Sequence, residues 1–156
     1  MTDDDKHDLI WEIRYGMRFG RRQARLLDRM AMVLKIATIL AGSTAFVAVL
    51  GKHDDLVKWS GLAVAALGLL DAFWNPAGRA YKTREIETRY AMLDRDADHL
   101  NASDLKRRIA ELYDAEAPEL GTLRPIVYND VVTELGDSES EKMQLNWWQS
   151  MVRVVA

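Results

Sequence analysis

Residues 62–74, LAVAALGLLDAFW, decide the fold of this chain, because the stretch is apolar enough for a membrane yet contains one carboxylate, Asp71. Working outward, most of the uninterrupted apolar sequence of the 156-residue chain lies between Met30 and Gly78, and charged residues crowd both sides of it. An ionised group inside a bilayer needs a partner or a route to water. The surroundings of Asp71 are therefore the first question.

Two segments of this region are long enough to cross a bilayer. Residues 36–51, IATILAGSTAFVAVLG, carry no charge, and starting the segment at Met30 adds only Lys35. A run of this length spans a hydrocarbon core of about 30 Å. The second segment is the weaker candidate for a transmembrane helix because its uncharged core is short. The sequence predicts transmembrane helices at 30–51 and 56–78, joined by an outer turn at 52–55.

Basic residues flank both segments. Six arginines precede the first segment, and four basic residues follow the second: Arg14, Arg18, Arg21, Arg22, Arg25 and Arg29, then Arg79, Lys82, Arg84 and Arg89. By the positive-inside rule, both termini are expected in the cytoplasm of a two-span membrane protein. The acidic N-terminus is not expected to act as a signal peptide. The alternative is a soluble helical bundle with an unusually apolar centre.

The apolar pattern continues on both sides of the predicted membrane segments. Stripes spaced by three and four residues run through 10–31 and 86–100, which predicts a coiled-coil-like stem. If the hairpin turns at 52–55, facing residues have numbers that sum to about 107. Ile10 then lies beside Ala97, Ile13 beside Leu93 or Asp94, and Met17 beside Tyr90. The predicted fold is all-α, with two long antiparallel helices, cytoplasmic parts at 1–29 and 79–100, and a kink at Asn75-Pro76.

The same arithmetic gives Asp71 a partner. Its level on the hairpin corresponds to position 35 or 36, and Lys35 is the one charge in the first segment. We predict that Lys35 and Asp71 pair, within one hairpin or between neighbouring hairpins, in a polar set that includes Thr38 and Ser60. The alternative is that each charge reaches water separately near the interface.

Small residues form a predicted assembly surface. They repeat at short intervals in both segments, which lets helices approach closely in lipid. Packing within one hairpin and oligomerisation are both compatible with the pattern. The residues are Ala37, Ala41, Ala45, Gly61, Ala65 and Gly68.

Five arginines ahead of the first segment share one helical face and are predicted to bind anionic lipid headgroups. They are Arg14, Arg18, Arg22, Arg25 and Arg29. The alternative is pairing with Glu85, Glu87 and Asp94 of the returning helix. The net charge of −3 and the lack of interleaved aromatics argue against nucleic acid as a partner.

The remaining residues, 101–156, are predicted to form a cytoplasmic helical tail. One helix is expected to begin at a Ser103 cap and end before Pro118, and a second to run from Leu123 or Pro125 to Leu135. A third covers Lys142 to Val155, where Trp147 and Trp148 either anchor at the membrane interface or pack on the bundle.

The chain has no pattern of a catalytic or metal site. Cysteine is absent, the three histidines are scattered, and neither a phosphate-binding glycine loop nor a metal-binding histidine pair occurs. We therefore expect no enzymatic activity, no cofactor and no metal.

Two stretches resemble the SLATT family, the two-transmembrane domains that associate with SMODS nucleotidyltransferases or SLOG sensors in bacterial conflict systems. They are IRYGMRFGRRQARLLDRM (13–30) and EAPELGTLRPIVYNDVVTELG (116–136), and the resemblance covers about 9–136. It implies an effector that oligomerises in the inner membrane and forms a pore or otherwise breaches it. The implied trigger is a nucleotide signal or a sensor partner.

A membrane anchor or scaffold for a cytoplasmic partner is the alternative to a pore-forming effector in antiviral defence. A pore needs polar groups facing a shared axis, whereas an anchor needs none. The polar set around Lys35 and Asp71 favours the pore.

Overall fold

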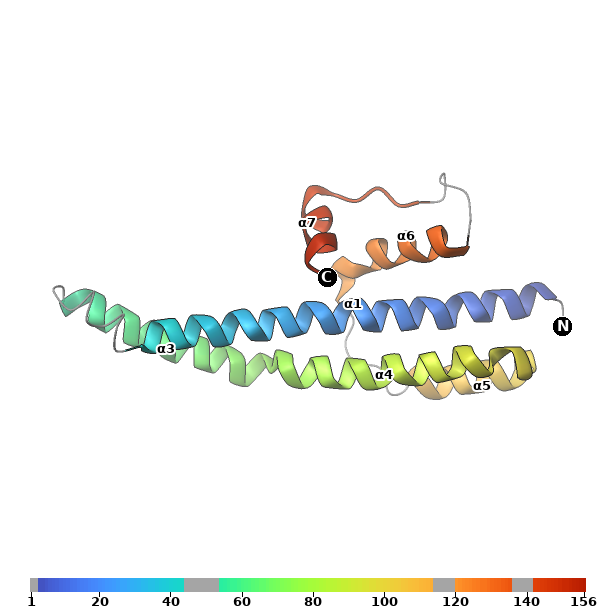
Figure 1. Ribbon diagram of the computed structural model, residues 1–156, viewed down its shortest axis with the longest axis horizontal. Helices are drawn as coiled ribbons and strands as arrows, with labels where there is room; N and C mark the ends of the chain where they lie inside the picture. Colours follow the sequence, from blue (N-terminus) through green and yellow to red (C-terminus); the bar gives the residue numbers. More distant parts are fainter. Residues whose placement is uncertain (1–2, 44–53, 114–119, 136–141) are drawn as a thin grey trace. The chain divides into compact units, whose positions relative to one another are not determined.

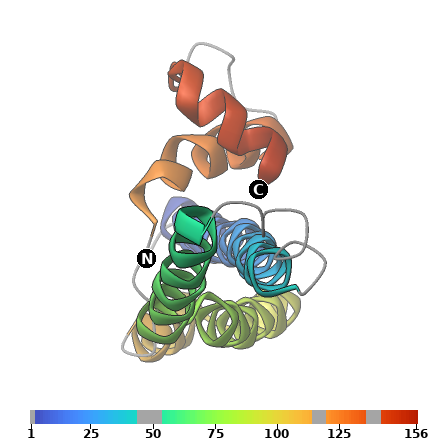
Figure 2. The same cartoon turned by 90° about the vertical axis from the view of Figure 1, so that its left-hand side faces the viewer.

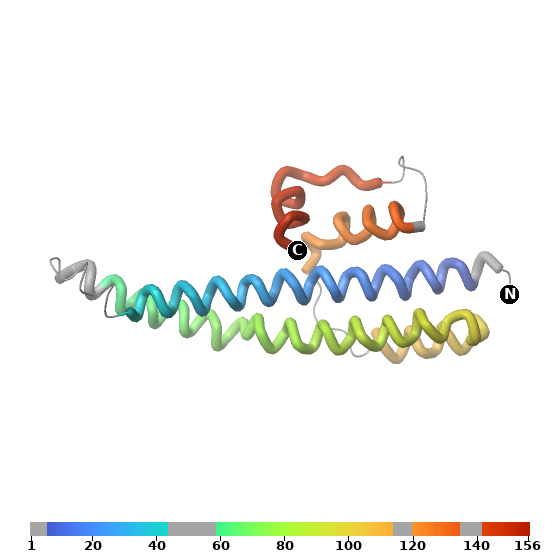
Figure 3. Tube along the Cα trace, in the orientation of Figure 1, coloured from blue at the N-terminus to red at the C-terminus, as the bar shows by residue number. Residues whose placement is uncertain are grey.

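The computed structural model describes residues 3–43, 54–113, 120–135 and 142–156. Each secondary-structure element in these residues is helical, which confirms the predicted all-α class (Figure 1; Figure 3). In chain order the elements are α1 (Asp3–Gly42), α3 (Asp54–Trp74), α4 (Pro76–Asp96), η1 (Ala97–His99), α5 (Ala102–Tyr113), η2 (Gly121–Leu123), α6 (Arg124–Leu135) and α7 (Trp147–Val155).

The chain divides into two compact units. The first, here called the stem unit, comprises Met1–Leu26 and Arg79–Ala156, and the second, the apolar unit, comprises Leu27–Gly78. Helix α1 is continuous from Asp3 to Gly42 and contributes to both units.

In the stem unit, α1 and α4 are antiparallel neighbours with the predicted register. Arg14 Nε lies 3.4 Å from Asp94 Oδ1, and Arg21 Nε lies 2.8 Å from Glu87 Oε1. In each pair the two residue numbers sum to 108, close to the predicted 107. The apolar stripes meet in one buried core, as predicted. Its buried members come from α1, α4, η1 and α5: Ile13, Tyr90, Leu93, Ala97, Leu105, Ile109 and Leu112.

Gly16 makes room on α1 for the ring of Tyr90 from α4. A Cβ atom built on this residue would lie 2.7 Å from Cζ of Tyr90. Any side chain would therefore displace a ring that is 2% exposed. The position needs glycine because the tyrosine ring packs directly on the α1 backbone.

A second core joins α6 and the C-terminus to α1. Its buried residues are Phe19, Leu123, Ile126, Val127, Val131 and Ala156. Beside this core, Trp11 stacks on Tyr15 with ring centroids 5.3 Å apart, and Tyr128 of α6 meets the Trp11 ring edge-on at 5.8 Å. Figure 2 shows α6 and α7 next to each other in this unit.

The C-terminal helices lie close to the predicted ones, with two corrections. Helix α5 is capped by Asn101, whose Oδ1 accepts a hydrogen bond from the Asp104 amide at 2.8 Å, so the predicted Ser103 cap is wrong. Helix α7 begins at Trp147, five residues later than expected, because Asn146 and Gln149 form a capping box there. The bounds of α6 agree with the prediction.

The break between α3 and α4 lies where the sequence predicts a kink. Asn75 adopts a positive φ of 42°, and its amide donates to the Asp71 carbonyl at 2.8 Å, which closes α3. Its side-chain Oδ1 accepts from the Gly78 amide at 3.0 Å and caps α4, in which Pro76 is the first residue. Proline suits that position because its missing N–H would have no helical partner.

Within the described residues, no helix is both long enough and apolar enough to cross a membrane. The described part of the first predicted span is 30–43, and its helical residues 30–42 rise only about 20 Å at 1.5 Å per residue. The rest of that span and residues 52–53 of the predicted outer turn lie outside the described residues. The fold therefore confirms the helical class and does not by itself support the predicted transmembrane hairpin.

Candidate functional site

The apolar unit turns many large side chains outward. Phe73 is 86% exposed, and nine further apolar residues on α1 and α3 are at least 45% exposed: Met32, Val33, Ile36, Ile39, Leu40, Trp59, Leu62, Leu69 and Leu70. In the stem unit the apolar stripes of α1, α4 and α5 form a buried core, although α7 also exposes Trp147, Trp148, Met151 and Val154. Large exposed apolar surfaces are rare on monomeric soluble proteins and mark contacts with lipid or protein.

One face of each helix in the apolar unit is less exposed than the rest. On α3 this face repeats every three or four residues and contains Ser60, Val64, Leu67, Asp71 and Trp74; on α1 it contains Leu27, Ala31, Leu34, Thr38 and Ala41. Three of the four predicted polar residues therefore lie on these faces. The Thr38 hydroxyl donates to the Leu34 carbonyl at 2.9 Å, so it is already satisfied within its own helix.

Lys35, the fourth predicted polar residue, is exposed. Among the described residues no ion pair joins it to Asp71. The predicted pairing within one hairpin is therefore not present in this structure. Pairing between neighbouring copies stays a prediction.

The small residues of α3 lie on its outward side. Gly61, Ala65 and Gly68 are exposed, and a Cβ atom built on either glycine would meet nothing within 4 Å. Within the described residues, these three positions are therefore not packed against the rest of the hairpin. Of those on α1, Ala37 and Ala41 are half-buried, and Ala45 lies outside the described residues.

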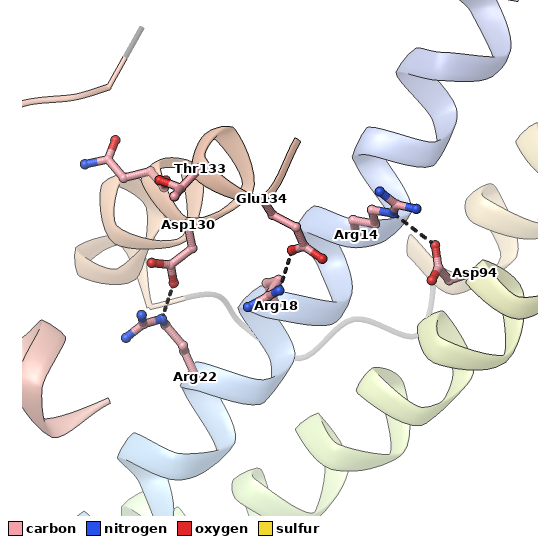
Figure 4. A network of polar contacts seen from close by, with 8 residues as sticks. Arg14, Arg18, Arg22, Asp94, Asp130, Thr133 and Glu134 are labelled. Carbon is pink, nitrogen blue, oxygen red and sulfur yellow. Dashed lines mark hydrogen bonds and ion pairs between the residues drawn. The ribbon is translucent and has the colours of Figure 1, made fainter. Parts of the chain in front are cut away.

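The predicted arginine face is largely occupied inside the stem unit (Figure 4). Arg22 Nε lies 2.6 Å from Asp130 Oδ2, and Arg18 pairs with Glu134, so α6 docks on α1 through two ion pairs. Arg14 pairs with Asp94 of α4, which is the alternative that the sequence left open.

Headgroup binding by Arg14, Arg18 and Arg22 competes with contacts inside the stem unit and stays a prediction. Their guanidinium groups already form ion pairs with carboxylates of the same chain, and Arg22 Nη1 also donates to the Arg153 carbonyl at 3.3 Å. Arg25 and Arg29 are exposed. A role for these two in headgroup binding stays a prediction.

Sequence reasoning missed Asp130 and Glu134, although a signal for them exists. The two carboxylates are four residues apart on α6, and their partners Arg22 and Arg18 are four residues apart on α1. Both pairs sum to 152, which is the pattern of two antiparallel helices. Matching the spacing of opposite charges would have located this interface.

A buried polar link connects three segments of the stem unit. The Gln23 side chain, 3% exposed, accepts a hydrogen bond from the Leu120 amide at 3.2 Å and donates to Thr83 Oγ1 at 3.5 Å. Thr83 in turn donates to the Arg79 carbonyl at 2.9 Å. This link holds the start of the η2 segment against α1 and α4.

Within the described residues, no three His, Cys, Asp or Glu side chains are grouped to hold a metal ion. Comparison with protein-family models, curated proteins and solved structures finds no match to this chain. Any functional assignment therefore depends on the chain's own chemistry.

Proposed function

We propose that this chain is a non-catalytic membrane effector of the SLATT type. In this proposal, residues 30–51 and 56–78 form a two-span hairpin in the inner membrane with both termini in the cytoplasm. Copies assemble and form a pore or otherwise breach the membrane. The stem unit receives the trigger, which is a nucleotide signal or a sensor partner.

The outward apolar surface of the apolar unit is the observation that carries this proposal. Removing one large apolar side chain from water contributes roughly 1.5–3 kcal/mol. Ten such side chains are exposed on α1 and α3 between residues 32 and 73. Contact with lipid accounts for their outward orientation.

The exposed small residues of α3 support assembly. Gly61, Ala65 and Gly68 leave the α3 backbone open to close approach, and none of the described residues fills that space at the glycines. Helices in lipid associate through such surfaces, because without a hydrophobic driving force between them close packing decides the contact. A second copy of the hairpin is the expected neighbour.

A membrane anchor for a cytoplasmic partner is the second candidate. One observation favours it: the Thr38 hydroxyl is satisfied by the Leu34 carbonyl and needs no aqueous path. The two candidates differ in whether assembled copies conduct.

Flotation on a density gradient after alkaline carbonate washing tests the membrane assignment. A protein that floats with lipid is integral, whereas one that remains at the bottom refutes both candidates and leaves a soluble helical bundle. Dye release from liposomes then separates the candidates. An effector releases dye and loses that activity in Asp71→Asn but not in the matched stem variant Asp98→Asn. An anchor floats and releases none.

A further inference from the structure

A groove of about 400 Å³ opens beside the N-terminal half of α1. Five residues line it: Asp8, Trp11, Glu12, Tyr15 and Tyr113. All of them belong to the stem unit. The groove is open to solvent rather than enclosed.

The groove combines aromatic rings with carboxylates. Trp11 and Tyr15 are stacked with an interplanar angle of 9°. Tyr113, at the end of α5, is held by its hydroxyl, which donates to Glu12 Oε1 at 2.6 Å. Aromatic faces attract cations through their quadrupole, and the carboxylates supply full negative charges.

The two carboxylates that line this groove, Asp8 and Glu12, do not stabilise α1 itself. Asp8 and Glu12 are four residues apart on α1, a spacing at which like charges repel. The favourable effect of the helix dipole on acidic residues fades after the first turn. Residues 3–12 contain five carboxylates and one lysine, and that lysine donates to the Asp98 carbonyl at 3.4 Å. A bound cation between Asp8 and Glu12 would relieve the repulsion.

A second, smaller cavity shares three lining residues with the groove. Glu12, Tyr15 and Tyr113 also line this cavity of about 50 Å³, which reaches the buried Gln23 and Thr83. That cavity has mostly apolar walls, which suit a small alkyl group.

We infer that this groove binds a small organic cation, with its ammonium group between Asp8 and Glu12 and its alkyl groups against Trp11, Tyr15 and Tyr113. The inference does not depend on the proposed membrane function. A lysine-like primary ammonium and a quaternary ammonium share the required chemistry, so the test includes one of each.

Isothermal titration calorimetry of the full chain with choline and with spermidine tests the inference. At least one of them is expected to bind, and the uncharged choline isostere 3,3-dimethylbutan-1-ol is not. Tighter binding of choline would identify an aromatic cage for a quaternary ammonium, and tighter binding of spermidine would identify carboxylates that hydrogen-bond a primary ammonium. Binding of the uncharged isostere with equal affinity, or no binding of either cation, would overturn the inference.

Variants locate the site. Asp8→Asn and Tyr113→Leu change exposed side chains and are expected to weaken cation binding about three- to tenfold each. Glu111→Gln, an exposed acidic position on α5 that does not line the groove, is the matched control and should leave the affinity unchanged. Equal affinities in Asp8→Asn and Glu111→Gln would place any bound cation elsewhere.

Discussion

Replacing Arg22 with glutamine is expected to loosen α6 from α1. The Arg22 and Asp130 side chains are 19% and 16% exposed, so their 2.6 Å ion pair lies between the surface and buried cases. Exposed pairs contribute up to about 1 kcal/mol, whereas breaking a buried pair costs about 3–5 kcal/mol. We expect a loss of about 2 kcal/mol, because glutamine leaves the Asp130 carboxylate poorly compensated.

Hydrogen exchange of the amides in residues 124–135 measures this loss directly. A change of ~2 kcal/mol corresponds to exchange about 30-fold faster in α6. Combining Arg22→Gln with Asp130→Asn should cost less than the sum of the single changes, because the two side chains interact directly. Arg89→Gln, which breaks the exposed Arg89–Glu85 pair of α4, is the control and should leave α6 exchange unchanged. Unaltered α6 exchange in Arg22→Gln would refute the reasoning.

Three further predictions concern packing, the break between α3 and α4, and the charges of Lys35 and Asp71. Gly16→Ala places a Cβ atom 2.7 Å from Cζ of Tyr90 and should lower the unfolding free energy by about 1–3 kcal/mol; an unchanged melting temperature would contradict the close approach. Asn75→Ala removes a helix cap at a positive φ and should cost about 1–2 kcal/mol in thermal unfolding, whereas Asn75→Gly should cost less; the reverse order would be inconsistent with this role. If Lys35 and Asp71 pair between copies, Lys35→Asp and Asp71→Lys should each reduce crosslinking between copies and the double variant should restore it, whereas additive losses would argue against pairing.

The register of the stem was predictable because it depends on local periodicity. A stripe with steps of three and four residues sets which face of each helix is apolar, and one turn position then fixes which residues meet. The pairs Arg14–Asp94 and Arg21–Glu87 agree with that arithmetic to within one residue. The helix break at Asn75 was also predictable, because proline limits its own backbone and that of its predecessor.

The arginine face was not predictable in the same way. Arginines next to an apolar segment suit lipid headgroups and carboxylates equally well, so the partner depends on which helix docks there. Helix α6 is more than one hundred residues away in the sequence, and local periodicity does not indicate where it packs. The groove was not predicted for the same reason, since Tyr113 comes from another helix than the other four lining residues. These are Asp8, Trp11, Glu12 and Tyr15 of α1.

The sequence by itself determined the helical class, the facing residues of α1 and α4 and the break at Asn75, because backbone sterics and apolar periodicity act over a few residues. The tertiary structure alone decided that Arg18 and Arg22 hold α6, that Gly61 and Gly68 face outward, and that Tyr113 closes an acidic aromatic groove. The two ion pairs and the groove join segments distant in the chain, and their energies depend on burial and on the partner that packing supplies.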